Sequence, residues 1–548
     1  MLRLLSISNY TLFVYYLISN LIYLVLLITA IFRNTLHRYR LASLRLERLK
    51  ASPFTPPIAL LVPAHNEGKF IVESVGSLLL LDYPAMEIVV INDGSRDDTL
   101  EELKRVYQLR EARLLYLPEI PTAPLRAIYR SAVEPRLLVL DKDSAGSKAD
   151  AVNAGLNAAT SPYVCIVDAD SILEKDSLLR IMAGVLSDPG RVMAVGGIVR
   201  ILNGSRVVRG ELAEVKLPKR GIEVFQVIEY LRAFLIGREA WAQFNVLPII
   251  SGAFGVFRTD LVRAVGGYGS RAIGEDFDLV VRLHRYLQEQ DKDYQISFIP
   301  DPTCWTEVPS DLRSLARQRA RWQKGLIDTL WPNRDMLFRK RYGLVGSLIL
   351  PYMWFFELLA PVVELTGYCT IILAAVLGLL SHQFFLLFLL FGYAFATLIS
   401  IGSVLLEEMN LPPLQPGVRC CTPAALLLVR ALPLPSAHDD LALARHLAIL
   451  ARRPAVAGDE AHRPVRTLVV HLRRKLKPRL RADGVTLLFC GSGFRAMRVS
   501  VLPECQKLLI ALTGRGFVAC CLRRSSDAVD GLGTLGVRLE LEEIVLWL

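Results

Sequence analysis

Two aspartates separated by one residue stand at the end of a short apolar run. The run covers residues 163–167, and Asp168-Ala169-Asp170 follows it directly. Carboxylate oxygens are the ligands that Mg²⁺ and Mn²⁺ prefer, and a cation held by Asp168 and Asp170 would neutralise a diphosphate leaving group. Because an ordinary acidic turn has the same pattern, the motif by itself does not decide between a metal site and a turn.

Polar residues also follow two earlier apolar runs. Pro63-Ala64-His65-Asn66-Glu67 ends the first, and the second ends in Asn92-Asp93-Gly94, with Asp97, Asp98 and Thr99 shortly after. Asp93 can accept hydrogen bonds from a base or a ribose, and Gly94 permits a tight turn into the next helix. The alternative is a plain turn in which Asp97 or Asp98 caps that helix, and we expect the capping role for Asp98 in either case.

A lysine marks the start of another predicted helix. Lys148 lies in the stretch Gly146-Ser147-Lys148-Ala149-Asp150, which continues to Gly155. An ammonium group and the free backbone N–H groups of a helix start both favour phosphate. A solvated helix terminus explains an isolated lysine almost equally well.

Two motifs in the later part of the chain carry charged groups. Gly274-Glu275-Asp276-Phe277-Asp278 opens a predicted helix. One carboxylate here can deprotonate an attacking hydroxyl; we assign that role to Asp276, with Glu275 beside it, and the alternative is helix capping. Gln318-Arg319-Ala320-Arg321-Trp322 lies in a basic stretch, for which the alternative is an interfacial helix with Trp322 as a membrane anchor.

The elements between these motifs predict an α/β fold. Runs at 58–62, 87–91, 163–167 and 192–195 are typical of strands, and stretches at 70–81, 99–108 and 149–159 have the spacing of amphipathic helices. This alternation indicates a doubly wound, mainly parallel sheet. The early polar motifs follow strand ends, so we expect them to meet at the carboxyl edge of that sheet.

Hydrophobic segments on both sides of this region predict a membrane protein. The chain has 548 residues, 52% of them hydrophobic, and a formal charge of +11. Residues 12–32 are long enough to cross a ~30 Å hydrocarbon core. The residues after this span are rich in Arg and Lys, which places them in the cytoplasm. Residues 343–380 divide into an interfacial helix and a crossing helix, and 383–406 cross back.

The positive charge suits anionic lipid or phosphate-bearing substrates. No basic stretch is interleaved with aromatic residues as in a nucleic-acid-binding module, so we expect membrane lipids as partners and no nucleic acid. We expect a multi-pass protein of the cell (inner) membrane whose α/β domain faces the cytoplasm.

These features divide the chain into four parts. Residues 1–50 form the first span with its basic flank, 51–342 the α/β domain, 343–411 the interfacial and later spanning helices, and 412–548 an atypical basic tail. Six of the nine cysteines lie in the tail. Codons for 412–420 read one nucleotide later can encode Arg-Arg-Tyr-Ser-Arg-Ala-Ser-Asp, so we hypothesise that the tail is a frameshifted, poorly ordered segment.

The motifs, in this order, resemble the family 2 glycosyltransferases. The resemblance is to the processive membrane branch with the cellulose, hyaluronan and poly-N-acetylglucosamine synthases, and it spans residues 12–411. It implies a catalytic domain of the GT-A type, with a doubly wound mixed sheet flanked by transmembrane helices. The single span before the catalytic domain looks most like the poly-N-acetylglucosamine synthases.

The resemblance also implies roles for individual residues. It places Glu67 and Asp93 around the uridine, Lys148 near the nucleotide, Asp168 and Asp170 at the diphosphate and metal, and Asp276 as general base. The motif that contains Gln318, Arg319, Arg321 and Trp322 matches the Gln-x-x-Arg-Trp signature of chain-extending members. Ser251-Gly252-Ala253 is similar to the turn at the acceptor end.

The reaction implied is an inverting transfer from a UDP-sugar to a growing β-linked polysaccharide, dependent on Mg²⁺ or Mn²⁺. The donor is expected to carry N-acetylglucosamine or glucose. The alternative within the same chemistry is transfer of one sugar to a lipid, with a glycolipid product. A transporter or scaffold that only binds nucleotide is a third reading, and the accumulation of charged motifs argues against it.

Overall fold

The structure is a computed structural model that describes residues 2–43, 46–114, 116–208, 210–269, 272–380, 382–410, 507–513 and 516–522. The chain divides into two compact units, Met1–Pro454 and Ala455–Leu548. In the second unit, β13 (Lys507–Thr513) and β14 (Gly516–Leu522) pair antiparallel. The frameshift and the poor order predicted for the tail otherwise fall outside the described residues.

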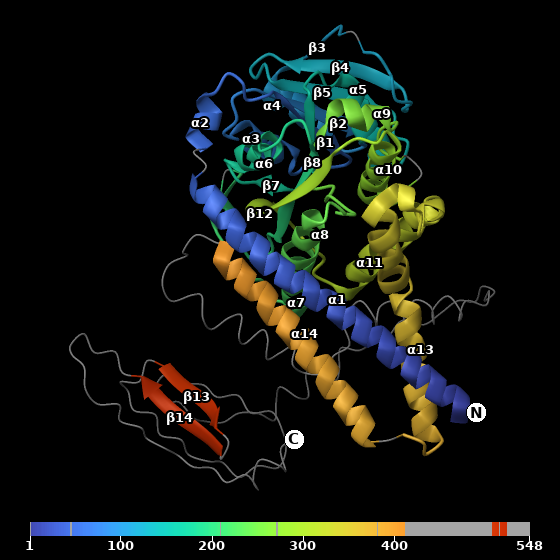
Figure 1. Cartoon of the computed structure of the whole chain (residues 1–548). Helices are drawn as coiled ribbons and strands as arrows, with labels where there is room; N and C mark the ends of the chain where they lie inside the picture. Colours follow the sequence, from blue (N-terminus) through green and yellow to red (C-terminus); the bar gives the residue numbers. More distant parts are fainter. Residues whose placement is uncertain are drawn as a thin grey trace, which may run out of the picture. The chain divides into compact units, whose positions relative to one another are not determined.

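The core of the first unit is a ten-stranded mixed sheet in the order β3-β4-β5-β2-β1-β6-β11-β8-β12-β7 (Figure 1). Its strands are β1 Ile58–Ala64, β2 Met86–Asp93, β3 Leu109–Glu111, β4 Leu125–Ser131, β5 Leu137–Lys142, β6 Tyr163–Val167, β7 Ile172–Leu173, β8 Val192–Ile201, β11 Phe254–Arg258 and β12 Gln295–Thr306. The predicted mixed α/β class is confirmed.

Parallel pairing is confined to two parts of the sheet. β5, β2, β1 and β6 pair parallel with one another, as do β8 and β12. β11 runs antiparallel to both β6 and β8 and so joins the two parallel parts. Every residue of β8 is buried, as expected for a strand covered on both faces. The four predicted strands are present, and the predicted end of β8 at 195 falls six residues short of the observed end at Ile201.

Helices cover the sheet on both faces. They are α3 Ile71–Leu79, α4 Thr99–Tyr107, α5 Lys148–Ala158, α6 Ser177–Leu186, α9 Thr259–Ala264 and α10 Glu275–Glu289. α5 contacts β1 and β2, whereas α6 contacts β8 and β12. A Cβ atom on Gly155 of α5 would meet Ile91 Cδ1 at 2.9 Å, so glycine is what lets this helix lie so close to the sheet.

A long irregular helix crosses the end of the domain. α7 (Gly221–Leu231), the π-helix η1 (Arg232–Arg238) and α8 (Glu239–Gln243) follow one another without a break. The N-terminal helix α1 (Leu2–Ser43) contacts both η1 and α8 (Figure 1). α1 therefore ties the membrane side of the molecule to the α/β domain.

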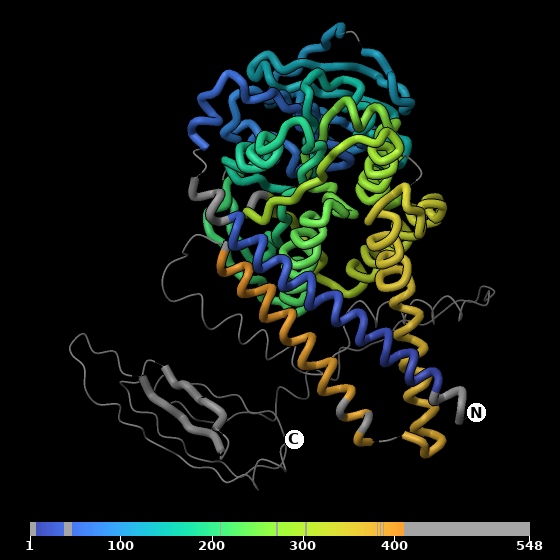
Figure 2. Tube along the Cα trace, viewed as in Figure 1, coloured from blue at the N-terminus to red at the C-terminus, as the bar shows by residue number. Residues whose placement is uncertain are grey.

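Two helices are long and apolar enough to cross a membrane, and a bent pair allows a third crossing. The two are Ile7–His37 within α1 and Phe388–Met409 within α14 (His382–Asn410), and these helices lie side by side (Figure 2). The bent pair is Val345–Leu358 with Ala360–Val376, at 43°. The division predicted for 343–380 agrees with this bend.

Shorter elements complete the described chain. They are α2 Leu46–Ala51, β9 Arg206–Val208, β10 Glu211–Glu214, α11 Leu312–Leu330, η2 Arg334–Met336, η3 Lys340–Tyr342, η4 Val345–Ile349, α12 Leu350–Tyr352, η5 Met353–Leu358 and α13 Ala360–Val376. β9 and β10 form a separate two-stranded hairpin.

Candidate active site

Three carboxylates gather where β1 and β6 end. Asp168 and Asp170 follow β6, and Glu67 follows β1 on the neighbouring strand. Asp170 is exposed to solvent. Desolvation by the surrounding protein nevertheless raises the pKa of Asp170 to about 6, and the negative charges of Asp168 and Glu67 add to this shift. Burial and the charge of Asp97 likewise raise the pKa of Glu67. Like charges at one edge of the sheet favour a bound cation.

Lys148 connects this acidic edge to the turn before β11. Lys148 is the first residue of α5. Its ammonium forms an ion pair with Asp168 and donates to the carbonyl oxygen of Gly252 at 3.2 Å. Burial lowers the pKa of Lys148, but the neighbouring Asp168 carboxylate outweighs it and the net shift is upward. A Cβ atom on Gly252 would lie 3.3 Å from Lys148 Nζ, so this position has little room for a side chain.

The predicted base lies on the other side of the same turn. The Gly252 amide donates to Asp276 Oδ2 at 3.3 Å, and the Phe277 amide donates to Asp276 Oδ1 at 2.8 Å. Two backbone donors thus orient this carboxylate at the start of α10. Burial and the charge of Asp276 raise the pKa of the adjacent Glu275. Ser251, the first residue of the turn, accepts from the Ala253 amide at 3.4 Å.

Helix α11 is held against the start of α10 by two glycines. A Cβ atom on Gly325 would meet the backbone nitrogen of Gly274 at 2.7 Å. The N-terminal end of α11 is fixed by Asp311, whose Oδ1 accepts from the Ser314 amide at 2.9 Å. Backbone contact between the two helices therefore brings the 318–322 motif close to Asp276.

The side chains of the 318–322 motif differ in their surroundings. Arg319 is buried, forms an ion pair with Glu229, and lies over the Trp322 ring at 4.2 Å. Gln318 Oε1 and Arg319 Nη1 are buried atoms without a hydrogen-bond partner. Arg321 is exposed, and Trp322 is 45% exposed. Arg319 is thus fixed by the protein, whereas Arg321 and Trp322 are accessible to a ligand.

Asp93 belongs to a separate network around a buried lysine. Its carboxylate pairs with Lys142 Nζ at 2.7 Å and accepts from Ser144 Oγ at 3.0 Å. Lys142 is fully buried and also pairs with Asp150 at 2.6 Å. Sequence reasoning missed Lys142 and Asp150; the signal was the Asp141-Lys142 pair directly after the apolar run 137–140. Asp150 lies two residues after Lys148, so α5 connects this network to the acidic edge.

The prediction that Asp98 caps α4 is wrong. Asp98 occupies the N-cap position but makes no side-chain capping hydrogen bond. Instead, Asp97 Oδ1 accepts from the Thr99 amide at 3.1 Å, and Asp97 Oδ2 accepts from the Gly68 amide at 2.9 Å. Asp97 therefore fixes both the start of α4 and the loop that carries Glu67.

Two further groups near the site were not predicted. Burial raises the pKa of Tyr230 to about 12, and the charges that act on it come from Arg319, Glu229, Arg238 and Asp170. Burial lowers the pKa of Arg238 to about 10, and the groups that oppose this shift are Asp276 and Tyr230. Tyr230 is therefore within electrostatic range of Asp170, and Arg238 is within electrostatic range of Asp276.

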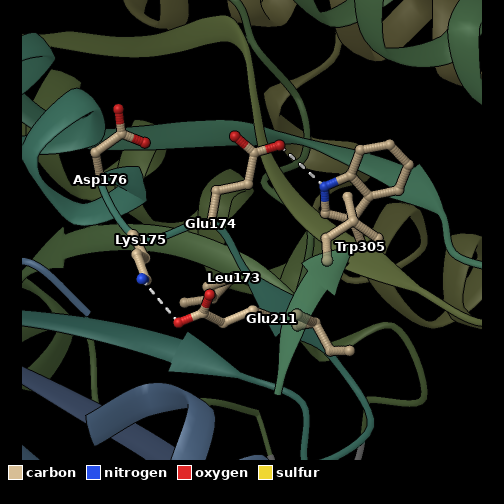
Figure 3. Close-up of a pocket in the computed structure, with 8 residues that line it drawn as sticks. Leu173, Glu174, Lys175, Asp176, Glu211 and Trp305 are labelled. Atoms are coloured by element: carbon tan, nitrogen blue, oxygen red, sulfur yellow. Dashed lines mark hydrogen bonds and ion pairs between the residues drawn. The ribbon is translucent and has the colours of Figure 1, made fainter. Parts of the chain in front are cut away.

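A cavity of about 390 Å³ lies beside β7 and the β9–β10 hairpin (Figure 3). In it, Trp305 Nε1 donates to Glu174 at 3.1 Å, and Lys175 pairs with Glu211 at 2.8 Å. Its lining residues are Ile172, Leu173, Glu174, Lys175, Asp176, Glu211, Leu212 and Trp305. No predicted site residue is among them, so this cavity is separate from the contacts that join Asp168 to Asp276.

The acidic edge fits a divalent cation that is shared with a ligand. In the described part of the chain, no three His, Cys, Asp or Glu side chains are grouped to hold a metal ion. Asp168 and Asp170 supply hard oxygen donors, and the pKa of Asp170 is raised first by desolvation and then by the negative charges of Asp168 and Glu67. Since Mg²⁺ is commonly held by one or two carboxylates plus substrate phosphates, the donor set suits that arrangement.

Comparisons with known proteins place the chain among sugar-transferring proteins. Residues 163–399 match the family model described as Glycosyl transferase family group 2, and residues 59–119 match Glycosyl transferase family 2. A Staphylococcus epidermidis poly-beta-1,6-N-acetyl-D-glucosamine synthase is 27% identical over 308 residues, or 55% of this chain and 63% of that protein. The Staphylococcus aureus (strain COL) protein of the same name is 28% identical over 303 residues, covering 55% and 60%.

The chain thus spans about three fifths of the length of these curated relatives. Among solved structures, the mannosyltransferase PcManGT from Pyrobaculum calidifontis, in complex with GDP-Man and Mn²⁺, aligns with a TM-score of 0.44 and 19% identity. It covers 78% of this chain and 98% of that one.

Proposed function

We propose that this chain, which belongs to the family 2 glycosyltransferases, transfers sugars from a UDP-sugar to a growing β-linked polysaccharide at the cytoplasmic face of the membrane. Relatives named as poly-beta-1,6-N-acetyl-D-glucosamine synthases support N-acetylglucosamine as the first donor to test, and glucose is the second. The positive-inside distribution around the first span supports the cytoplasmic placement.

One observation carries the proposal: a continuous series of contacts joins the donor side to the base side. Asp168 pairs with Lys148, Lys148 donates to the Gly252 carbonyl, and the Gly252 amide donates to Asp276. Groups from three distant parts of the sequence therefore share one small region. Such fixed positioning of oppositely charged groups is what a displacement reaction requires.

The reaction is a single displacement with inversion. Asp276 accepts the proton of an acceptor hydroxyl while that oxygen bonds to the anomeric carbon and the bond from this carbon to the diphosphate oxygen breaks. Lys148 and the free amides at the start of α5 stabilise the departing diphosphate. A Mg²⁺ or Mn²⁺ ion held by Asp168 and Asp170 would neutralise charge on that diphosphate.

The 318–322 motif provides the acceptor side. Trp322 has an accessible ring on which a sugar can pack, and the exposed Arg321 can reach the diphosphate or the acceptor. Arg319 holds the Trp322 ring from its other side through the contact at 4.2 Å. We assign Gln318 to the acceptor because its carbonyl oxygen is buried without a protein partner.

The test is a donor screen with the full chain in lipid nanodiscs. UDP-N-acetylglucosamine, UDP-glucose and UDP-galactose are supplied with Mg²⁺, with Mn²⁺ or with EDTA, and nucleotide release and product length are measured. We expect cation-dependent release from UDP-N-acetylglucosamine and a ladder of products that extends over many sugars. A single sugar added to an extractable lipid would overturn polymer synthesis, and no release from any donor would overturn sugar transfer.

A further inference from the structure

Arg238 ends a π-helix in the middle of a long helix. η1 covers Arg232–Arg238 and is continuous with α7 before it and α8 after it. A π-helical segment widens the helix and redirects the side chains that follow, and such segments are frequent at functional sites. Here the last residue of the segment is an arginine on which the charge of Asp276 acts.

The guanidinium group of Arg238 has an unused donor. Its Cζ lies 3.8 Å from the centre of the Phe234 ring, so one face of the group rests on an aromatic surface. Its Nη1 atom is buried and has no hydrogen-bond partner. A buried donor without a partner is unfavourable by about 1–3 kcal/mol in general, so this donor is available to a ligand that supplies an acceptor.

The charges around Arg238 point to the acceptor side of the reaction. Asp276 is the charged group that acts most strongly on it, followed by the hydroxyl of Tyr230. The described residues include no ion pair between Arg238 and Asp276, so the two opposite charges are close without direct contact. The acidic edge is served by a different cation, since Lys148 pairs with Asp168.

Helix α1 fixes both ends of η1. Glu239, the residue after Arg238, accepts from Arg33 Nε of α1 at 3.0 Å, and Gln243 accepts from Arg33 Nη1 at 2.8 Å. At the other end, the Arg232 guanidinium lies 5.4 Å from the centre of the Tyr23 ring, also on α1. These contacts hold the backbone of η1 in place, and Arg238 is therefore held toward Asp276.

We propose that Arg238 is a further acceptor-binding residue: its Nη1 donates to an oxygen of the acceptor sugar next to the hydroxyl that gives its proton to Asp276. This inference rests on the proposed function and deepens it, because it assigns a positively charged contact to the acceptor rather than to the nucleotide. The acceptor is a neutral, hydroxyl-bearing sugar, which an arginine recognises through hydrogen bonds.

The experiment compares Arg238→Gln, Arg238→Lys and the control Arg105→Gln, which removes an exposed arginine of α4 that pairs with Glu102. The full chain in nanodiscs is given saturating UDP-N-acetylglucosamine and a short β-1,6-linked N-acetylglucosamine oligosaccharide at varied concentration. Acceptor KM, kcat, the Kd of UDP and the thermal unfolding temperature are measured for each variant.

We expect Arg238→Gln to raise the acceptor KM by about 10- to 100-fold, the range for a lost hydrogen bond to a charged group, with the Kd of UDP unchanged within about twofold. Arg238→Lys keeps the charge but not the planar fork, so its KM should fall between those of the wild type and Arg238→Gln. Arg105→Gln should keep the wild-type KM.

The outcomes separate the inference from the proposed function. An unchanged acceptor KM in Arg238→Gln, an equal loss of UDP affinity, or the same loss in Arg105→Gln overturns the inference while the transfer reaction stands. A wild-type chain that transfers no sugar from any UDP-sugar overturns the proposed function, and the inference falls with it.

Discussion

Two groups of carboxylates lie at neighbouring strand ends, and they differ in how their charge is balanced. In the Lys142 cluster, the fully buried Lys142 pairs with both Asp93 and Asp150. In the Asp170 cluster, which comprises Asp168, Asp170 and Glu67, the ion pair from Lys148 reaches Asp168. The pKa values of Asp170 and Glu67 are raised.

The difference separates a structural role from a ligand-binding one. In the Lys142 cluster both carboxylates have an ion pair with the buried lysine, so the cluster holds β2, β5 and α5 together and is a poorer cation site than carboxylates without such a partner. A group of carboxylates with too few cations is unfavourable until a ligand supplies positive charge. We therefore interpret the Lys142 cluster as structural support and the Asp170 cluster, with Asp276 beyond Lys148, as the place of the chemistry.

The largest expected effect comes from removing the base beside the Asp170 cluster. Asp276→Asn keeps the size and the hydrogen-bonding shape of the side chain but cannot take a proton. Turnover should fall by about 10²- to 10⁴-fold, the usual contribution of a general base, with unchanged affinity for UDP. Steady-state nucleotide release and UDP titration check both values; activity above a tenth of wild type would place the base elsewhere.

The Lys142 cluster should respond in stability rather than in ligand binding. Lys142→Met leaves Asp93 and Asp150 buried without a counter-charge, which destabilises by about 3–5 kcal/mol in comparable cases. Lys175→Met is the matched control, because it breaks an exposed pair with Glu211 and should change stability by less than about 0.5 kcal/mol. Denaturant unfolding of the full chain measures both, and equal effects would remove the contrast between the clusters.

Protonation of the Asp170 cluster at low pH should reduce the activity. Because the pKa of Asp170 is raised to about 6, this carboxylate gains a proton as the pH falls through 6, and a protonated carboxyl is a poor metal ligand. Activity should therefore fall by about tenfold per pH unit below 6. Added Mn²⁺ should shift this acidic part of the pH–activity profile to lower pH. A pH–activity profile that does not shift with Mn²⁺ would contradict the assignment of Asp170 as a metal ligand.

The raised pKa of Asp170 also predicts how the stability of the folded chain depends on pH. The pKa of Asp170 in the folded protein lies above its value of 3.8 in the unfolded chain. The ionised carboxylate therefore lowers the free energy of unfolding at neutral pH. This destabilisation disappears as the pH falls from 6 to 4. The metal-free Asp170→Asn protein should consequently be at least as stable as the wild type at neutral pH. A lower unfolding temperature for this variant, measured in EDTA, would contradict the idea of a charge excess.

The smallest effect separates the two aspartates that precede α4. Asp97→Ala removes the bonds to the Thr99 and Gly68 amides and should cost about 1 kcal/mol, the usual value of a lost cap. Asp98→Ala removes no capping bond and should change stability by less than about 0.5 kcal/mol. Unfolding midpoints of the two variants provide the comparison, and the reverse order would contradict the described loop.

Strand ends and charged motifs were predictable from the sequence because they depend on local pattern. The run at 163–167 coincides with β6, and the Asp-x-Asp motif follows it directly. The antiparallel insertion of β11 between β6 and β8 was not predicted, since no local signal states which strands pair across about 90 residues. The contact of Lys148 with the Gly252 carbonyl depends on that insertion.

The remaining differences also arise from tertiary contacts. Asp93 was expected to face the ligand, but a buried lysine from β5 takes up its carboxylate. Tyr230 and Arg238 stand in an apolar, helix-forming stretch, and the influence of Asp276 on Arg238 arises only in the folded chain, where η1 packs on α1. The sequence shows that position 93 is an aspartate and position 238 an arginine, but it does not show which side chains these residues contact.

The most direct test of the account is a Mn²⁺ titration of the full chain, followed by electron paramagnetic resonance, with and without UDP. Since the protein supplies two aspartates and no third grouped ligand among the described residues, we predict weak binding of Mn²⁺ alone, binding at least tenfold tighter with UDP, and loss of this gain in Asp170→Asn. If Mn²⁺ bound equally well without UDP, or if Asp170→Asn bound Mn²⁺ and UDP like the wild type, the acidic edge would not be the donor site.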